Sequence, residues 1–284
     1  MSFFALLTHI TQYRYDRPVK LGTQTLRLCP RVGGITPVSN YSIQIEPLQH
    51  SIEWQLDATN NRVALLSFPE PISTLNIAVG MTLDLSLSNA IHSSDALPAL
   101  NFEPAPLDLY PYRFTVPTPS LTAYAASGMS LIVPHDQLAA ALLWWARQLK
   151  ADIGYTVRLE AGVQSPEETL AKRTGSCRDT AWLLVHICRA AGWPARFVSG
   201  YWVELVAERL DSQMHDGELH AWCEVLHPQR GWLAIDPTAG GWAGVGYVPL
   251  ACAADPIPTA PLEGWVDSAG VSLTHSLRVS RALL

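Results

Sequence analysis

Positive charge is scarce in this sequence. Of its 284 residues, 19 are lysine or arginine and 25 are aspartate or glutamate, which gives a formal net charge of −6. The basic residues do not gather in any one segment. Because binding to nucleic acid needs a basic patch, we expect no nucleic-acid partner.

Long apolar runs are absent as well. No stretch approaches the ~18 consecutive apolar residues that a membrane helix needs, so we expect no membrane partner. Residues 1–7 form a short apolar patch, but neither a basic leader nor a small-residue cleavage site accompanies it. We therefore expect a cytoplasmic protein.

Cysteine is sparse, and its pattern excludes two structural uses. The five cysteines are odd in number and widely spaced, and no C-x-x-C pair occurs, which argues against a disulfide framework and against structural zinc. No acidic loop has the ligand spacing of a calcium site. We expect no metal or other cofactor, and at least one free thiol among Cys29, Cys177, Cys188, Cys223 and Cys252.

The first ~90 residues alternate with the period of β-strands. Met81, Leu83 and Leu85 alternate with polar residues, and the same pattern recurs at 41–46 and 52–56. Half-buried strands joined by short turns indicate an antiparallel sheet or sandwich, which we assign to residues 1–97. Six prolines between Pro98 and Pro119 predict an extended linker over residues 98–119.

Beyond the linker, the period becomes helical. Residues 120–284 are expected to form a second unit, an α+β core. The pattern predicts an amphipathic helix, a short helix beginning at a proline, a largely apolar and therefore buried helix, and three strands. These elements are expected at 136–150, near 166, at 177–191, and at 195–206, 219–226 and 232–236.

The segment TGSCRD at residues 174–179 has the pattern of a helix start. Ser176 followed by Asp179 is typical of a capping box, which places Cys177 in the first turn. There the helix dipole favours the thiolate, and free N–H groups are available to a developing oxyanion. Gly175 is expected to let a substrate approach the backbone. The alternative is an inert buried cysteine, a description that also fits Cys188 and Cys223.

Two later residues are candidates to assist this thiol. His220 lies in an expected strand, and Asp236 ends the next strand after a short turn. Antiparallel pairing of these strands would bring Asp236 opposite His220, where a carboxylate can orient the imidazole. The three residues Cys177, His220 and Asp236 therefore form a candidate triad.

Four segments of the second half together resemble the core of the bacterial transglutaminase-like superfamily. They are GSCRD at 175–179, GWPARFVSGY at 192–201, HAWCEV at 220–225 and GWLAIDPT at 231–238. The first half resembles the β domain that precedes this core in one bacterial branch, through YRYDRPV at 13–19, LRLCPR at 26–31, and Asp57 with Asn60 and Asn61. The resemblance implies a papain-like α+β fold, with Cys177 as nucleophile, His220 as base and Asp236 as orienting residue.

Two departures from this family pattern stand out. A Gly-Arg-Asp segment is usual after the Asp-Pro-Thr motif, but residues 253–255 here read Ala-Ala-Asp. The substrate contact of that arginine is therefore expected to be missing. Asn60 replaces a turn glycine, and asparagine tolerates the same left-handed dihedrals.

The sequence leaves open the roles of four further candidate site residues. By analogy with relatives, Tyr155 is a candidate oxyanion donor, and the alternative is an aromatic residue packed at a helix end. Trp222 is expected either to line the cleft or to be plain core. Arg178 and Arg196 either recognise a substrate carboxylate or make structural ion pairs.

These observations favour thiol-dependent amide chemistry through a thioester. The expected substrate is a peptide or protein, attacked at a peptide or glutamine-like amide, with hydrolysis slightly favoured over transamidation. One alternative is a catalytically silent binding module with the same fold. Another is a metallohydrolase using His215 and His220, although these residues lack the helical i, i+4 spacing of many zinc sites.

Overall fold

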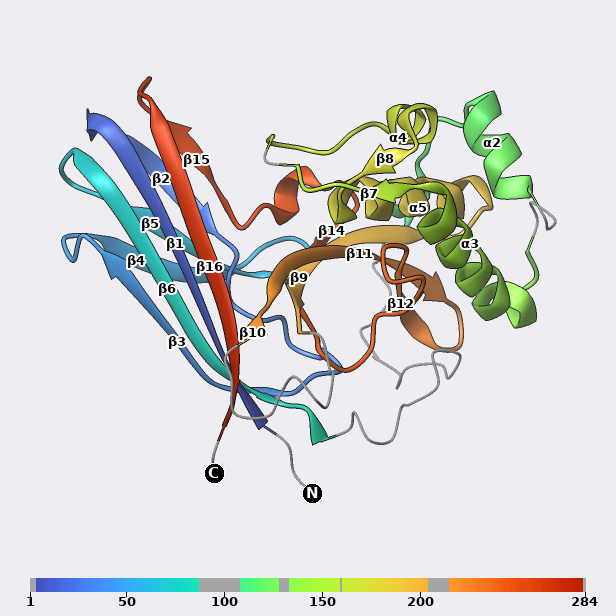
Figure 1. The fold of residues 1–284 in the computed structure, drawn as a ribbon, viewed down its shortest axis with the longest axis horizontal. Helices are drawn as coiled ribbons and strands as arrows, with labels where there is room; N and C mark the ends of the chain where they lie inside the picture. Colours follow the sequence, from blue (N-terminus) through green and yellow to red (C-terminus); the bar gives the residue numbers. More distant parts are fainter. Residues whose placement is uncertain (1–3, 87–107, 128–132, 159, 204–214, 283–284) are drawn as a thin grey trace.

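The computed structural model describes residues 4–86, 108–127, 133–158, 160–203 and 215–282. A β-rich unit, mostly blue and cyan with two red strands, lies beside an α+β core (Figure 1). This arrangement confirms the expected fold class. No helix among the described residues has both the length and the apolar character to cross a membrane.

The β-rich unit contains two antiparallel sheets whose apolar residues form a shared core. One sheet has the order β10-β16-β1-β6-β3 and the other β15-β2-β5-β4. The N-terminal strands are β1 (Phe4–Val19), β2 (Leu21–Leu26), β3 (Val38–Glu46), β4 (Ser51–Leu56), β5 (Arg62–Ser67) and β6 (Ile72–Asp84).

The expected alternation of buried and exposed residues holds best in β1 and β6. Leu7 of β1 and Leu75, Ile77 and Val79 of β6 are almost fully buried. Strand β4 differs, because all its residues are exposed, including Trp54 at 42%. The expectation of a half-buried strand is wrong there, since β4 is the edge strand of its sheet.

The chain returns to the β-rich unit at its C-terminal end. Strand β15 (Leu262–Val266) pairs with β2, and β16 (Val271–Arg281) pairs with β1 along most of its length. The short β10 (His215–Asp216) pairs with β16. Strand pairing therefore places residues 262–281 with the N-terminal sheets, although we expected the core to continue to residue 284.

The α+β core contains an antiparallel sheet of order β13-β12-β11-β9-β14. Helix α5 (Cys177–Ala190) packs against β9 and β11, and most of its residues are buried, as its apolar sequence predicted. The strands are β9 (Ala195–Trp202), β11 (Glu218–His227), β12 (Gly231–Asp236), β13 (Gly241–Trp242) and β14 (Tyr247–Ala253).

The remaining helices of the core follow the sequence pattern closely. Helix α3 (Leu138–Asp152) follows a 3-10 turn (His135–Gln137), and α4 (Pro166–Lys172) begins at the expected proline, with Ser165 as its N-cap. A parallel pair of two-residue strands, β7 (Gly154–Tyr155) and β8 (Thr174–Gly175), precedes α5. A second 3-10 turn (Ile257–Thr259) follows β14.

The proline-rich segment contains more structure than expected. Residues 98–107 lie outside the described residues, but α1 (Tyr110–Arg113) forms one turn and α2 (Pro119–Ala126) begins at the last proline. In both helices proline occupies the first or second position, where its missing N–H costs nothing. The expectation of a purely extended linker is therefore wrong over 110–113.

Candidate active site

Cys177 is the first residue of α5, as the sequence predicted. The Asp179 carboxylate accepts hydrogen bonds from the backbone N–H and the hydroxyl of Ser176, both at 2.8 Å. These bonds are the reciprocal half of the expected capping box. The Cys177 side chain is 8% exposed, at the end of the helix where unpaired N–H groups and the dipole favour an anion.

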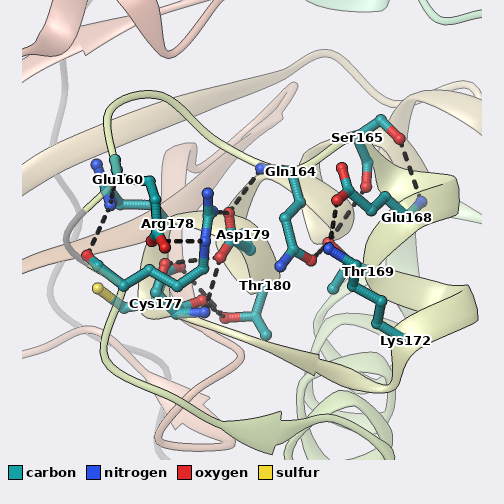
Figure 2. A network of polar contacts seen from close by, with 12 residues as sticks. Glu160, Gln164, Ser165, Glu168, Thr169, Lys172, Cys177, Arg178, Asp179 and Thr180 are labelled. Atoms are coloured by element: carbon teal, nitrogen blue, oxygen red, sulfur yellow. Dashed lines mark hydrogen bonds and ion pairs between the residues drawn. The ribbon is translucent and has the colours of Figure 1, made fainter.

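Asp179 also anchors the segment that precedes α4. Its carboxylate accepts from the backbone N–H of Gln164 at 2.7 Å (Figure 2). It also accepts from Nη1 of Arg158 at 2.6 Å. Burial would raise the pKa of Asp179, but these hydrogen bonds outweigh it and lower the pKa. Cys177 lies beside this network with its sulfur pointing away from Asp179 (Figure 2).

Two residues next to Cys177 make structural contacts. A Cβ on Gly175 would come within 2.9 Å of the Asp179 Cβ, so this glycine allows close packing against α5, and its expected role in substrate approach stays a prediction. Nη2 of Arg178 donates to the backbone carbonyls of Arg158 and Glu160, at 3.1 and 3.0 Å. The guanidinium of Arg178 therefore holds this segment against the helix.

His220 and Asp236 meet as the sequence predicted, although their positions along the strands differ slightly. Cys223 pairs with Ile235 in the β11–β12 ladder, so Asp236 lies diagonal to His220 and not directly opposite it. Nε2 of His220 lies 2.8 Å from Oδ2 of Asp236, and both side chains are buried.

Asp236 accepts further hydrogen bonds besides the one with His220, including one from the backbone N–H of Ala239. The hydroxyl of Tyr247 donates to Oδ2 at 2.8 Å, and the backbone N–H of Thr238 donates to Oδ1 at 2.7 Å. Burial would raise the pKa of Asp236, but its bonds to His220 and Tyr247 lower it. Tyr247 was missed by the sequence reasoning, because nothing near it in the chain points to Asp236.

The protonation of His220 depends on its partners. Burial alone would lower its pKa, but interactions with Asp236 and the nearby thiol of Cys177 raise it from 6.5 to about 10. Asp236 occupies Nε2, so Nδ1 is the ring nitrogen left for the thiol of Cys177, whose interaction with His220 is one of those that raise its pKa. The raised pKa favours the charged form of His220 at neutral pH.

Aromatic rings surround the His220–Asp236 pair. The rings of Trp202 and Tyr247 lie 5.3 and 6.0 Å from the His220 ring. Trp222, a predicted cleft residue, is only 1% exposed and packs edge-on against Tyr247 at 5.4 Å. A Cβ on Gly200 would collide with the Trp222 ring. These contacts fit the packing alternative for Trp222 better than a substrate contact.

Tyr155 lies near Cys177 and faces solvent. It is 53% exposed and pairs with Gly175 in the β7–β8 ladder, two residues before the cysteine. Its pKa is raised by partial burial and by electrostatic interactions with Cys177 and Glu218. The alternative of a residue packed at a helix end fits such an exposed ring poorly, and the role of oxyanion donor stays a prediction.

The other candidates lie away from the thiol. Arg196 forms a buried ion pair with Glu224 at 2.7 Å and lies over the Trp232 ring. These contacts fit the structural alternative for Arg196 and not substrate recognition. His215 belongs to β10, which pairs with β16. Across the described part of the chain, no three His, Cys, Asp or Glu side chains gather as metal ligands would.

The helix start and the His220–Asp236 pair are also linked directly. The hydroxyl of Thr180 lies 3.1 Å from that of Thr238 and also donates to the carbonyls of Ser176 and Cys177. The segment after Asp236 is therefore attached to the first turn of α5. An arrangement of a thiol at a helix start, a cationic imidazole and a buried carboxylate can attack a carbonyl and return a proton to the leaving group.

Two family models match this chain. Residues 6–84 match the bacterial transglutaminase-like N-terminal region, and residues 132–237 match the transglutaminase-like superfamily. An uncharacterized protein of Mycobacterium tuberculosis is 27% identical over 278 residues, which cover 91% of this chain and 86% of that protein.

Two other proteins share part of the sequence or the fold. A protein-glutamine gamma-glutamyltransferase of Pseudomonas aeruginosa is 42% identical over 67 residues, which cover 23% of this chain and 10% of that protein. The solved structure of a candidate cysteine protease from Cytophaga hutchinsonii is similar over 99% of this chain and 98% of its own, with a TM-score of 0.65 and 17% sequence identity. At that identity the similarity shows a common fold alone.

Proposed function

This chain belongs to the transglutaminase-like superfamily, and from that premise we propose that it cleaves or exchanges amides through a Cys177, His220 and Asp236 triad. The supporting observation is the buried 2.8 Å contact between His220 and Asp236, made beside a sulfur at a helix start. A buried carboxylate in this position fixes the imidazole tautomer and stabilises its charged form.

The reaction begins with attack of the Cys177 thiolate on the amide carbonyl, which forms a carbon–sulfur bond and an oxyanion. The backbone N–H groups at the start of α5 support that oxyanion, and the Tyr155 hydroxyl is a second candidate donor. As the oxyanion collapses, the carbon–nitrogen bond breaks and the His220 imidazolium gives its proton to the departing amine. A thioester remains on Cys177.

A second nucleophile completes the cycle. His220, now neutral, takes a proton from water or from a primary amine as that molecule attacks the thioester. The carbon–sulfur bond then breaks and regenerates the thiolate beside the imidazolium. Water gives hydrolysis, whereas an amine gives transamidation.

The proposed substrate is a peptide or protein. The local similarity to a protein-glutamine gamma-glutamyltransferase supports a glutamine-like amide as the attacked group. The segment at 253–255 has no arginine for substrate recognition: Ala253 ends β14, the carbonyl of Ala254 accepts from Arg189, and Asp255 accepts from the N–H of Ile257. The cytoplasmic location stays a prediction.

Mass spectrometry of glutamine-containing peptides tests this function. The peptides are incubated with the protein, with and without a primary amine. Backbone fragments indicate a protease, a gain of about one dalton indicates side-chain deamidation, and an amine adduct indicates transamidation. The matched controls are Cys177→Ser, which should abolish every product, and Cys188→Ser, a buried cysteine on the same helix, which should not.

Two results would contradict the proposal. Products that persist in Cys177→Ser would show that another group performs the chemistry. If wild type yields no product from a broad peptide library and Cys177 is no more reactive toward iodoacetamide than the other cysteines, the silent binding module is favoured instead.

A further inference from the structure

Tyr247 is the one tyrosine among the described residues that bonds to Asp236. Its hydroxyl donates to Oδ2, the same oxygen that faces Nε2 of His220, with both contacts at 2.8 Å. The backbone N–H of Thr238 holds the other oxygen, Oδ1. The backbone N–H of Ala239 is a further donor to the carboxylate. Of these donors, only the Tyr247 hydroxyl comes from a strand that does not neighbour β12 in the sequence.

The strand that bears Tyr247 is held in place by the β-rich unit. Strand β14 is an edge strand of the core sheet, paired on one side with β9. Two hydrogen bonds also tie it to the first half of the chain: the N–H of Gly246, just before the strand, donates to Oγ1 of Thr36 at 2.9 Å, and the carbonyl of Pro249 accepts from the N–H of Arg31 at 2.9 Å.

A turn of the β-rich unit secures the far end of the same strand. The amide side chain of Asn61 accepts from the N–H of Cys252 at 2.8 Å and donates to its carbonyl at 3.0 Å, as a neighbouring strand would. Asp57 in turn binds the Asn61 side chain at 2.8 Å. Asn60 adopts the expected left-handed conformation, with φ of 59°, which allows the turn to close.

We propose that Tyr247 is a positioning residue of the triad, and that the β-rich unit acts on catalysis by holding β14 so that the Tyr247 hydroxyl stays on Asp236. This inference rests on the proposed function. Without the hydroxyl, the Asp236 carboxylate is held only by His220 and by the backbone N–H groups of Thr238 and Ala239, so Oδ2 is positioned less firmly against Nε2 of His220. The β-rich unit is thus an integral part of the catalytic site, although it supplies no reacting group.

Tyr247→Phe tests this role, because it removes one hydroxyl and keeps the ring contacts. We expect the iodoacetamide reaction of Cys177 to slow about tenfold, the usual effect of losing one hydrogen bond to a charged group. The pH profile of this reaction should also change. Its midpoint on the acid side should move to higher pH, because Asp236 loses a donor that stabilises its charged form. In an Asp236→Asn background, Tyr247→Phe should slow the reaction no further, because the hydroxyl acts through the Asp236 carboxylate.

Tyr201→Phe is the matched control. The Tyr201 hydroxyl is also buried and bonds to a histidine, His9, at 2.9 Å, but it does not contact the triad. We expect this variant to lose stability without a change in the rate or pH profile of Cys177. If both tyrosine variants slow the reaction alike, the effect comes from lost stability and the inference fails.

If Tyr247→Phe does not fold, Thr36→Val provides a second test of the same inference. Thr36→Val removes the acceptor of the Gly246 N–H and leaves Tyr247 in place, so it should slow Cys177 in the same direction by a smaller factor. Unchanged kinetics in the variants that fold would overturn the positioning role. A wild-type Cys177 without enhanced reactivity would instead overturn the proposed function, so the two failures are distinguishable.

Discussion

Two buried histidines occupy different regions of this molecule and have opposite protonation. His220 lies in the core sheet against a carboxylate, and its pKa is raised to about 10. His9 lies in the β-rich unit, where Nδ1 is 2.9 Å from the Tyr201 hydroxyl and Nε2 is 2.8 Å from that of Thr11. Burial and the nearby His275 lower the pKa of His9 to about 4.

The difference shows that the bonded partner decides the charge of a buried imidazole. Both rings are nearly inaccessible, with 1% exposure for His9 and 5% for His220. Hydroxyl groups satisfy the neutral ring without supplying negative charge, so burial dominates at His9. The carboxylate of Asp236, together with the thiol of Cys177, reverses that outcome at His220. The first histidine is therefore suited to a structural contact and the second to proton transfer.

The largest effect is expected from Asp236→Asn, which gives His220 a neutral partner like those of His9. The negative charge that opposes the effect of burial is then lost, and the pKa of His220 should fall from about 10. We expect the Cys177 reaction and any amide turnover to fall by roughly 10³-fold, because the imidazole loses its charged state and its orientation. Histidine ¹⁵N chemical shifts give the pKa, and a His220 that still titrates near 10 would contradict the account.

The same pair links stability to alkaline pH. The pKa of His220 is raised in the folded state, so its contribution to the free energy of unfolding is complete below pH 6.5 and is lost as the pH rises toward 10. Urea unfolding of wild type at pH 6 and pH 10 should show this loss. In Asp236→Asn this component should disappear.

His9 gives the opposite dependence, which His9→Gln should remove. Its pKa is lowered in the folded state, so its neutral form stabilises the fold above pH 6.5 and this contribution is lost as the pH falls toward 4. The shift from 6.5 to about 4 corresponds to about 3 kcal/mol. Urea unfolding between pH 7 and 4 measures this loss of unfolding free energy. An equal loss in wild type and His9→Gln would show that other groups cause it.

Tyr155→Phe tests whether the tyrosine near Cys177 donates to the oxyanion. If the hydroxyl stabilises the oxyanion, amide turnover should fall by about 10²-fold, or about 2.7 kcal/mol. Alkylation of Cys177 by iodoacetamide forms no oxyanion and should barely change. Peptide turnover and alkylation measured side by side decide this, and equal effects on both would assign Tyr155 to another role.

The smallest effect is expected from Thr11→Val, a change of similar shape in the His9 region. It removes the hydroxyl beside Nε2 of His9 and should lower the free energy of unfolding by about 1 kcal/mol. Turnover should be unaffected. A loss of turnover in this variant would mean that the two histidine regions are coupled.

The sequence predicted the local parts of the site well. The Ser176 and Asp179 pattern located the start of α5, and the short turn between β11 and β12 predicted the meeting of His220 and Asp236. These features depend on residues close together in the chain. The diagonal placement of the pair depends on the register of the ladder, which hydrophobic alternation does not specify.

Long-range contacts were not predictable from local patterns. Tyr247 reaches Asp236 only because β14 pairs with β9, and Asn61 reaches Cys252 across most of the chain. Arg158 resembles any surface arginine until the fold places it against Asp179. The return of β15 and β16 to the N-terminal sheets likewise has no local signal, because any alternating strand could occupy either unit.

The most direct test of the catalytic claim is the rate at which each of the five cysteines reacts with iodoacetamide near pH 7, followed by peptide mass spectrometry in wild type and His220→Ala. We predict that Cys177 reacts far faster than Cys29, Cys188, Cys223 and Cys252, and that His220→Ala slows Cys177 alone. Equal rates for all five, or a Cys177 rate that is indifferent to His220, would contradict the account.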